Sequence, residues 1–165
     1  MSIVRGLRHL LAEEWKLRRA FPRRVLQAIE RVVAEQEKRH RGELRFAVEG
    51  GLPLSRLLRG QSPRDRAVEL FGTLCVWDTE HNSGVLIYVL LADRAVEIVA
   101  DRGIQQRAGE AAWSEVCSRM QRAFAIGEFE LGAEAGIREV SDLISAHFPA
   151  SGANPNELPD KPVVL

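Results

Sequence analysis

The stretch that decides the fold is WDTEHNSGVLIYVLLADRAVEIVADRG, residues 77–103. Its first apolar run, residues 85–92, has no polar group except the Tyr88 hydroxyl and is rich in β-branched residues. Such a run is typical of a central strand covered on both faces. The second run, residues 95–101, follows after the turn Asp93-Arg94, which is too short for a helical crossover. The two runs are therefore expected to pair as antiparallel neighbours.

Helical periodicity predominates on both sides of this hairpin. Apolar side chains at helical spacing predict helices over about residues 22–40, 62–77, 109–124 and 125–148. The clearest helix start is SPRD, residues 62–65, where Ser62 caps the helix, Pro63 takes the first helical position and Asp65 completes a capping box. This helix is expected to end near Trp77 and to bury one stripe, Ala67, Val68, Phe71, Leu74 and Cys75.

One further strand is predicted at residues 43–49, ELRFAVE, where apolar and polar side chains alternate. The alternation favours a strand that is half covered or near an edge. The segment after it, GGLPLSRLLRGQ, is expected to link, with at most one helical turn.

The predicted order of elements, α–α–β–α–β–β–α–α, favours an α/β fold. Helices on both faces of a small mixed sheet give a three-layer α/β/α sandwich. At 165 residues the chain is expected to be one domain with tails. We predict a basic amphipathic helix in residues 1–20, the α/β domain in residues 21–148 and a Pro-rich extended tail in residues 149–165.

Basic residues are concentrated at the N-terminus. Residues 1–41 hold eleven Lys and Arg against five Asp and Glu, and the remainder of the chain is acidic by the same margin. Residues 3–11 have helical apolar spacing, so this segment is expected to dock on its own domain, on a second copy in a homo-oligomer, on a protein partner or on a membrane surface. No aromatic residues interleave its charges within residues 1–14, which argues against nucleic acid.

No signal peptide is visible, and the longest apolar run is far shorter than the ~20 residues that span a bilayer. We therefore expect a cytoplasmic location, with the inner membrane surface left open. The tail, residues 149–165, carries four of the seven prolines and is expected to be extended. It is expected either to be disordered or to pack its apolar end, residues 163–165, onto a partner or a symmetry mate.

Polar residues gather where the hairpin strands begin and end. Asp78, Glu80 and Asn82 precede the first strand, and Asp101 follows the second. Because antiparallel strands bring these ends together, the four side chains are expected to share one corner, roughly 25 Å from the Asp93 turn. Their oxygen atoms suit Ca²⁺ or Mg²⁺. The other interpretation is that Asp78 and Asn82 cap backbone groups in the loop and that Asp101 pairs with Arg102 or another arginine.

Catalytic motifs are absent from the sequence. Ser83 does not lie in a G-x-S-x-G elbow, and no phosphate-binding glycine motif is found. The two cysteines, Cys75 and Cys117, lie at apolar helical positions and are expected to be buried thiols. The chain is therefore hard to place among enzymes.

The motifs NSGVLIYV (residues 82–89), VEIVADRGI (96–104) and GEFELGAEAGI (127–137) resemble the TPM domain family, which includes bacterial proteins and a thylakoid-lumen protein of photosystem II repair. The resemblance covers about residues 22–148. It implies an α/β/α sandwich, calcium binding at loops at one end of the sheet and a weak phosphatase activity. It also implies a bacterial short form without a membrane anchor. Asn82 stands near an acidic position of the family, and Val99 stands where many members carry Glu.

Two functions follow as hypotheses. The first is a non-catalytic interaction module with a divalent-cation site at Asp78, Glu80, Asn82 and Asp101. The alternative is a metal-dependent phosphatase that hydrolyses phosphomonoesters at the same corner, with Arg102 next to the developing charge.

Overall fold

The computed structural model describes residues 5–6, 9, 14–151 and 155–165. Its sheet has the strand order β3-β2-β1-β4, where β1 is Leu44–Glu49, β2 is Val85–Leu90, β3 is Ala95–Ala100 and β4 is Val163–Val164. β2 and β3 pair antiparallel, as the short turn predicts, whereas β1 runs parallel to both β2 and β4. The predicted hairpin and the mixed sheet are confirmed.

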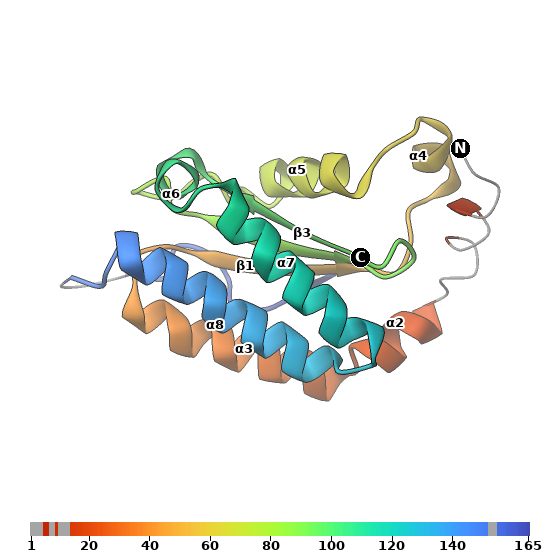
Figure 1. Ribbon diagram of the computed structural model, residues 1–165, viewed down its shortest axis with the longest axis horizontal. Helices are drawn as coiled ribbons and strands as arrows, with labels where there is room; N and C mark the ends of the chain where they lie inside the picture. The colour runs from red at the N-terminus through yellow and green to blue at the C-terminus, as the bar shows by residue number, and fades with distance from the viewer. Residues whose placement is uncertain (1–4, 7–8, 10–13, 152–154) are drawn as a thin grey trace.

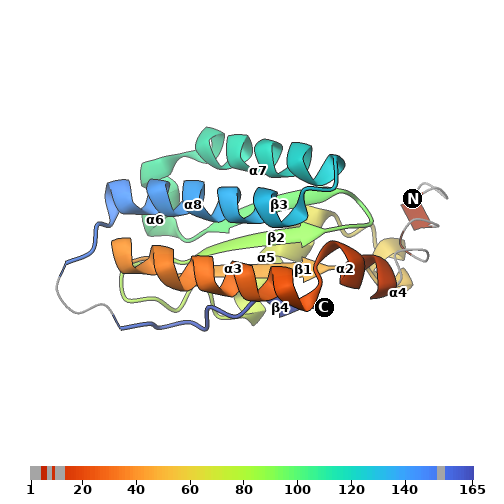
Figure 2. The same ribbon diagram turned by 90° about the horizontal axis from the view of Figure 1, so that it is seen from below.

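Helices cover both faces of this sheet (Figures 1 and 2). On one face lie the helices α2 Glu14–Ala20, α3 Arg23–Gln36, α7 Glu110–Ala125 and α8 Phe129–His147, and the short helices α4 Leu54–Leu58 and α5 Pro63–Thr73 lie on the other. A 3-10 turn, η1 Glu37–Arg39, follows α3, and α6 Arg102–Ala108 follows β3. The α/β/α sandwich predicted from the sequence is confirmed.

The larger core lies between the sheet and the α3, α7 and α8 layer. Alternate side chains of β1 and β2 enter it, because successive residues of a strand point to opposite faces. Phe21, at the junction of α2 and α3, packs its ring on Phe46, Phe124 and Phe129. This aromatic cluster holds the end of the domain where α2, α7 and α8 meet.

The smaller core lies under α4 and α5. The capping box at Ser62 and Asp65 is formed, as the sequence predicts, but α5 ends at Thr73. Its fully buried residues are Arg66, Ala67 and Leu70, and Phe71 and Leu74 pack partly buried against the same core, so the predicted stripe is wrong at Val68 and Cys75. Val68 is half exposed and Cys75 is exposed, because α5 turns toward the sheet the face that carries Arg66.

Strand β1 lies inside the sheet, not at its edge. All six of its residues are buried, including Arg45 and Glu49. The alternation that favoured an edge strand arises because two charged side chains are buried: Glu49 accepts Arg66 and the Tyr88 hydroxyl, and Arg45 lies near the carboxyl groups of Asp160 and Glu37. The prediction of a half-covered strand is therefore wrong.

The C-terminal tail covers the outer side of β1. It is extended, as expected, but Val163 and Val164 pair in parallel with Ala47 and Val48, so the apolar end packs on the chain's own sheet. The expectations of disorder and of packing on a partner are wrong for residues 155–165. Sequence analysis also missed α6, which is short and begins directly after β3.

The N-terminal prediction is only partly covered by the structure. The apolar residues at positions 3, 4, 7, 10 and 11 lie outside the described residues. Leu17 and Ala20 of α2 are buried in the larger core. Among the helices of the described ranges, none is long and apolar enough to cross a membrane.

Candidate functional site

The polar corner predicted at the start of the hairpin forms at the level of the backbone. The amide of Asp101 donates to the carbonyl of Gly84 at 2.8 Å. Gly103, in the first turn of α6, is packed so closely on the loop that a Cβ atom there would lie 2.6 Å from the carbonyl oxygen of Asn82. The loop before β2 and the residues after β3 therefore meet, as expected.

The four side chains at this corner do different things. Asp101 is 6% exposed and is the N-cap of α6, where its Oδ1 accepts from the amide of Arg102 at 2.6 Å. Its Oδ2 is buried and has no hydrogen-bond partner among the described residues. Asp78, Glu80 and Asn82 are exposed, and Asn82 has a left-handed φ of 51°.

The corner is not an assembled metal cage. Within residues 5–6, 9, 14–151 and 155–165, no three His, Cys, Asp or Glu side chains are placed to hold one ion. The other interpretation paired Asp101 with an arginine side chain, but its Oδ1 instead caps the backbone amide of Arg102. The Ca²⁺ or Mg²⁺ site at Asp78, Glu80, Asn82 and Asp101 stays a prediction.

The opposite end of the hairpin is more than a turn. The Asp93 carboxylate accepts hydrogen bonds from Arg5, through Nη2 at 2.9 Å and through Nε at 3.1 and 3.2 Å. It also accepts one from Nε2 of His9 at 3.0 Å. Burial raises the pKa of Asp93, but the hydrogen bonds from Arg5 and His9 outweigh burial and hold that pKa below its usual range. Asp93 therefore holds the N-terminal segment, which docks there through Arg5 and His9.

His9 and Asp93 do not form a catalytic pair. The Nδ1 atom of His9 accepts a hydrogen bond from the amide of Leu52 at 2.8 Å, so Nε2 carries the proton and donates to Asp93. A general base needs a free ring nitrogen near the proton that it removes. Both ring nitrogens of His9 have structural partners, and the pair therefore fixes the N-terminal segment to the domain.

Two other buried polar groups are also structural. Glu49 accepts both Arg66 and the Tyr88 hydroxyl, at 2.9 Å and 2.7 Å to the same oxygen. Burial, then the Glu49 charge, raises the pKa of Tyr88, so the phenol stays neutral. The second group is Glu37, whose pKa is raised to about 9 chiefly by burial and then by the nearby Glu43.

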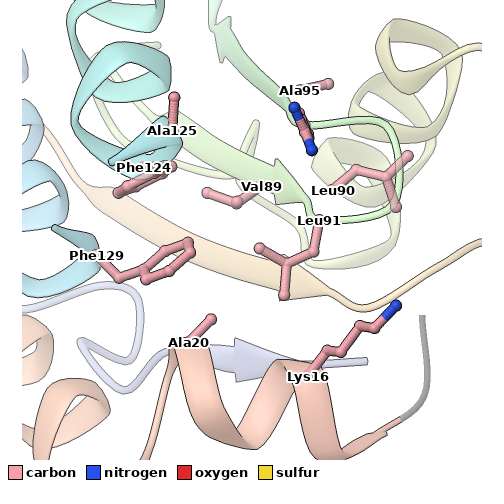
Figure 3. A pocket seen from close by; sticks show the side chains of 10 residues that line it. Lys16, Ala20, Val89, Leu90, Leu91, Ala95, Phe124, Ala125 and Phe129 are labelled. Carbon is pink, nitrogen blue, oxygen red and sulfur yellow. The ribbon is translucent and has the colours of Figure 1, made fainter. Parts of the chain in front are cut away.

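An apolar pocket of about 290 Å³ lies at the end of the sheet that carries the Asp93-Arg94 turn (Figure 3). It is lined by Lys16 and Ala20 of α2, Val89, Leu90 and Leu91 at the end of β2, Arg94 and Ala95 of the turn, and Phe124, Ala125 and Phe129 of α7 and α8. In Figure 3, Lys16 reaches along one side and the Phe124 and Phe129 rings stand at the other. No local sequence pattern predicts this pocket, because five separate segments build it.

Two exposed apolar side chains are chain neighbours of residues that line this pocket. Trp15 is 52% exposed, and its ring centroid lies 5.7 Å from Nζ of Lys16. Ile126, which follows Ala125, is 74% exposed. We call this surface the α2 end; it comprises Trp15, Lys16, Arg19, Arg94, Ile126 and the pocket.

These features define a mixed-sheet α/β/α domain in which the buried charges of Asp93, Glu49 and Arg66 are engaged in internal contacts and which has an apolar pocket at one end. The model of the TPM domain matches residues 18–143. The chain therefore belongs to the TPM domain family, as the sequence motifs indicated. Among solved structures, the NMR structure of the BA42 protein from the psychrophilic bacterium Bizionia argentinensis is similar, with a TM-score of 0.75 and 27% identity. The similarity covers 86% of this chain and 92% of that one. No match was found among curated proteins.

Proposed function

We propose that this TPM-domain chain is a non-catalytic interaction module that works through the α2 end. The observation that carries the proposal is the joint exposure of Trp15 and Ile126 beside an apolar pocket. Large apolar side chains grouped around a hollow mark binding surfaces more often than inert ones.

The buried groups support a role without chemistry. A catalytic site needs a nucleophile or a base that lies in a cleft and has an atom not already engaged in a hydrogen bond. His9 has partners at both nitrogens, Asp93 accepts Arg5, and Glu49 accepts Arg66. These contacts hold the N-terminal segment and α5 against the sheet, so these charged side chains stabilise the fold.

A cytoplasmic location at the face of the inner membrane is part of this proposal. Cys75 is exposed and is a free thiol. An exposed free thiol suits a reducing compartment, where disulfides are rare.

The test places a photo-crosslinking amino acid at Ile126 of the full chain, in cells. The control places the same group at Val68, which is 52% exposed on α5 of the opposite layer. We expect adducts to a protein or a lipid from position 126, fewer adducts when Trp15→Ala is added, and none from position 68. Equal labelling from both positions, or none from either, contradicts the proposal.

The alternative function is a metal-dependent phosphatase at the Asp101 corner, a chemistry that the name of the matched family model, TPM phosphatase, also carries. One observation favours it: the buried Oδ2 of Asp101 has no hydrogen-bond partner in the described part of the chain. An anionic oxygen in this position is a natural ligand for Ca²⁺ or Mg²⁺, which add charge stabilisation when bound. Exposed Asp78, Glu80 and Asn82 are the other oxygen donors of the loop.

Melting curves with and without Ca²⁺ or Mg²⁺ test the metal site, and hydrolysis of p-nitrophenyl phosphate with metal and with EDTA tests the activity. If a cation binds at Asp101, saturation at 100 times its Kd stabilises the fold by about 2.7 kcal/mol. Asp101→Asn should remove this gain. The matched control is Asp142→Asn, an exposed carboxylate on α8. If metal has equal effects on the two variants, a metal site at the Asp101 corner is excluded.

A further inference from the structure

We propose that the α2 end docks on the surface of an anionic lipid bilayer, with headgroup phosphates at Lys16 and Arg94 and the end of an acyl chain in the pocket. This inference rests on the proposed function, because it names the partner of the same surface. It is argued from the lining, the charge and the mouth of the pocket.

The lining of the pocket is suited to hydrocarbon. Eight of its ten residues are apolar, and Val89, which is 2% exposed, faces this side of the sheet, whereas the Leu90 side chain belongs to the smaller core on the opposite face. Phe124 and Phe129 stack with ring centroids 5.4 Å apart and form one wall. A volume of about 290 Å³ is at the lower end of the range of small-molecule sites. It fits a short length of chain and not a whole lipid.

The charge of the pocket selects an anion. The two charged residues of its lining, Lys16 and Arg94, are both cationic. Arg19 is exposed on α2 and adds to the same sign of charge. An apolar floor below a cationic mouth complements a molecule with a negative head and an apolar tail.

The exposed residues outside the pocket favour a bilayer over a free amphiphile as the ligand. A small ligand would be held by the pocket alone, whereas Trp15 and Ile126 stand exposed outside it. Trp is favoured at the interface between headgroups and hydrocarbon, and a helix that combines it with Lys and Arg is typical of binding in the plane of that interface. Anionic leaflets attract such cations.

The backbone at Arg94 provides a second, independent indication. Arg94 has a φ of 53°, which is uncommon for a residue other than Gly, Asn or Asp. Glycine would adopt this turn conformation without cost. A cation held in an unfavourable conformation at the mouth of a pocket is the kind of outlier that indicates a role for the side chain.

The experiment is co-sedimentation of the full chain with two kinds of vesicle, phosphatidylcholine alone and phosphatidylcholine mixed with phosphatidylglycerol. We expect binding only to the anionic vesicles, weakening as salt is added because exposed charges are screened. Lys16→Gln and Arg94→Gly should each weaken binding about fivefold, as expected for the loss of one cation near an anionic surface.

The matched control is Cys75→Gly. Cys75 has nearly the same backbone conformation as Arg94, with a φ of 54°, but it precedes β2 and is not part of the pocket. Both glycine variants should melt no lower than the wild type, because glycine adopts the left-handed backbone conformation of these two positions without strain. Cys75→Gly should bind vesicles like the wild type, so a loss in Arg94→Gly reports the side chain.

Several outcomes overturn the inference. These are equal binding to both vesicle types, binding that Lys16→Gln and Arg94→Gly leave unchanged, and binding of dodecanoate or of an acidic peptide without any binding to vesicles. If vesicles fail while crosslinks from position 126 reach a protein, the inference fails and the proposed function stands. If those crosslinks are also absent, both fail.

Discussion

Glu37 shows how burial sets the charge of one side chain. It is 7% exposed, and its Oε1 accepts the amide of Leu44 at 2.8 Å. Burial and the neighbouring Glu43 raise its pKa from 4.5 to about 9, so at neutral pH the carboxyl is protonated in the folded chain. In the unfolded chain it is ionised, and Glu37 therefore couples stability to pH.

Glu37→Gln tests this coupling. Between pH 4.5 and about 9 the unfolded chain releases a proton that the folded chain keeps, so the contribution of Glu37 to stability falls as pH rises, by up to about 1.4 kcal/mol per pH unit. Glutamine imitates the neutral acid and removes this loss. We expect a higher melting temperature than wild type at pH 8 and little difference near pH 4.5.

The control for this prediction is Glu35→Gln, an exposed position in the last turn of the preceding helix α3, which should shift neither melting curve. His40 has the opposite pH dependence, because burial lowers its pKa to about 4 and its contribution is lost as pH falls from 6.5. It is present in wild type and variant alike, so the difference between them isolates Glu37. A gain in Glu37→Gln that is the same at both pH values contradicts the argument.

Arg66 and Tyr88 make unequal contributions to the buried Glu49. Arg66→Ala leaves a carboxylate that is 5% exposed without its ion-pair partner, which costs about 3 kcal/mol or more. Tyr88→Phe removes one hydrogen bond while Arg66 stays, which costs about 1–2 kcal/mol. Urea unfolding at neutral pH measures both. A larger loss in Tyr88→Phe would show that the arginine is not the main partner.

At the scale of elements, the sequence predicted what depends on local pattern. The hairpin follows from two apolar runs and a short turn, which spans residues 91–94, and the start of α5 follows from Ser62, Pro63 and Asp65. Elements that depend on distant contacts were missed or misplaced. β1 lies inside the sheet only because β4, more than a hundred residues later, pairs with it. α6 had a local signal, Asp101 as an N-cap, but Gly103 in its first turn obscured it.

Strand β4 offers a test with a built-in control, because Val163 and Val164 point to opposite faces. Val163 packs against the smaller core, whereas Val164 is 48% exposed. Val163→Asp should cost about 2 kcal/mol by exposing apolar surface and burying a charge. Val164→Asp should cost less than about 0.5 kcal/mol. Thermal unfolding gives both values.

Loss of β4 also frees one side of β1. An unpaired strand edge is a template for another chain. Val163→Asp should therefore show faster amide exchange at Ala47 and Val48 and more self-association in gel filtration than Val164→Asp. Equal behaviour of the two variants would mean that the tail contributes nothing to the sheet.

At the scale of the whole molecule, the two ends of the sheet differ in how far they can be predicted. The Asp101 corner was predicted because antiparallel pairing fixes which ends of two neighbouring strands meet. The α2 end was not, since its pocket combines residues between Lys16 and Phe129 that come together only when α2, α7 and α8 pack. The docking of Arg5 and His9 on Asp93 was missed for the same reason.

Phe21 tests whether the α2 end is part of one cooperative unit. It is 3% exposed, and its ring lies 5.5–6.0 Å, between centroids, from the rings of Phe46, Phe124 and Phe129. Phe21→Ala leaves a cavity between β1, α7 and α8 and should cost about 3–5 kcal/mol. Phe71→Ala, at a partly buried position of α5, should cost less.

Because Phe21 contacts the strand layer and the helix layer together, its loss should lower the stability of both. Unfolding of Phe21→Ala, followed by far-ultraviolet circular dichroism and by tryptophan fluorescence, should give coincident transitions, with Trp113 of α7 reporting the core. Separate transitions would mean that the α2 end opens independently of the sheet. In that case the pocket would not persist as a rigid hollow. Its apparent affinity for an acyl chain would be the intrinsic affinity multiplied by the fraction of molecules in which the pocket is formed.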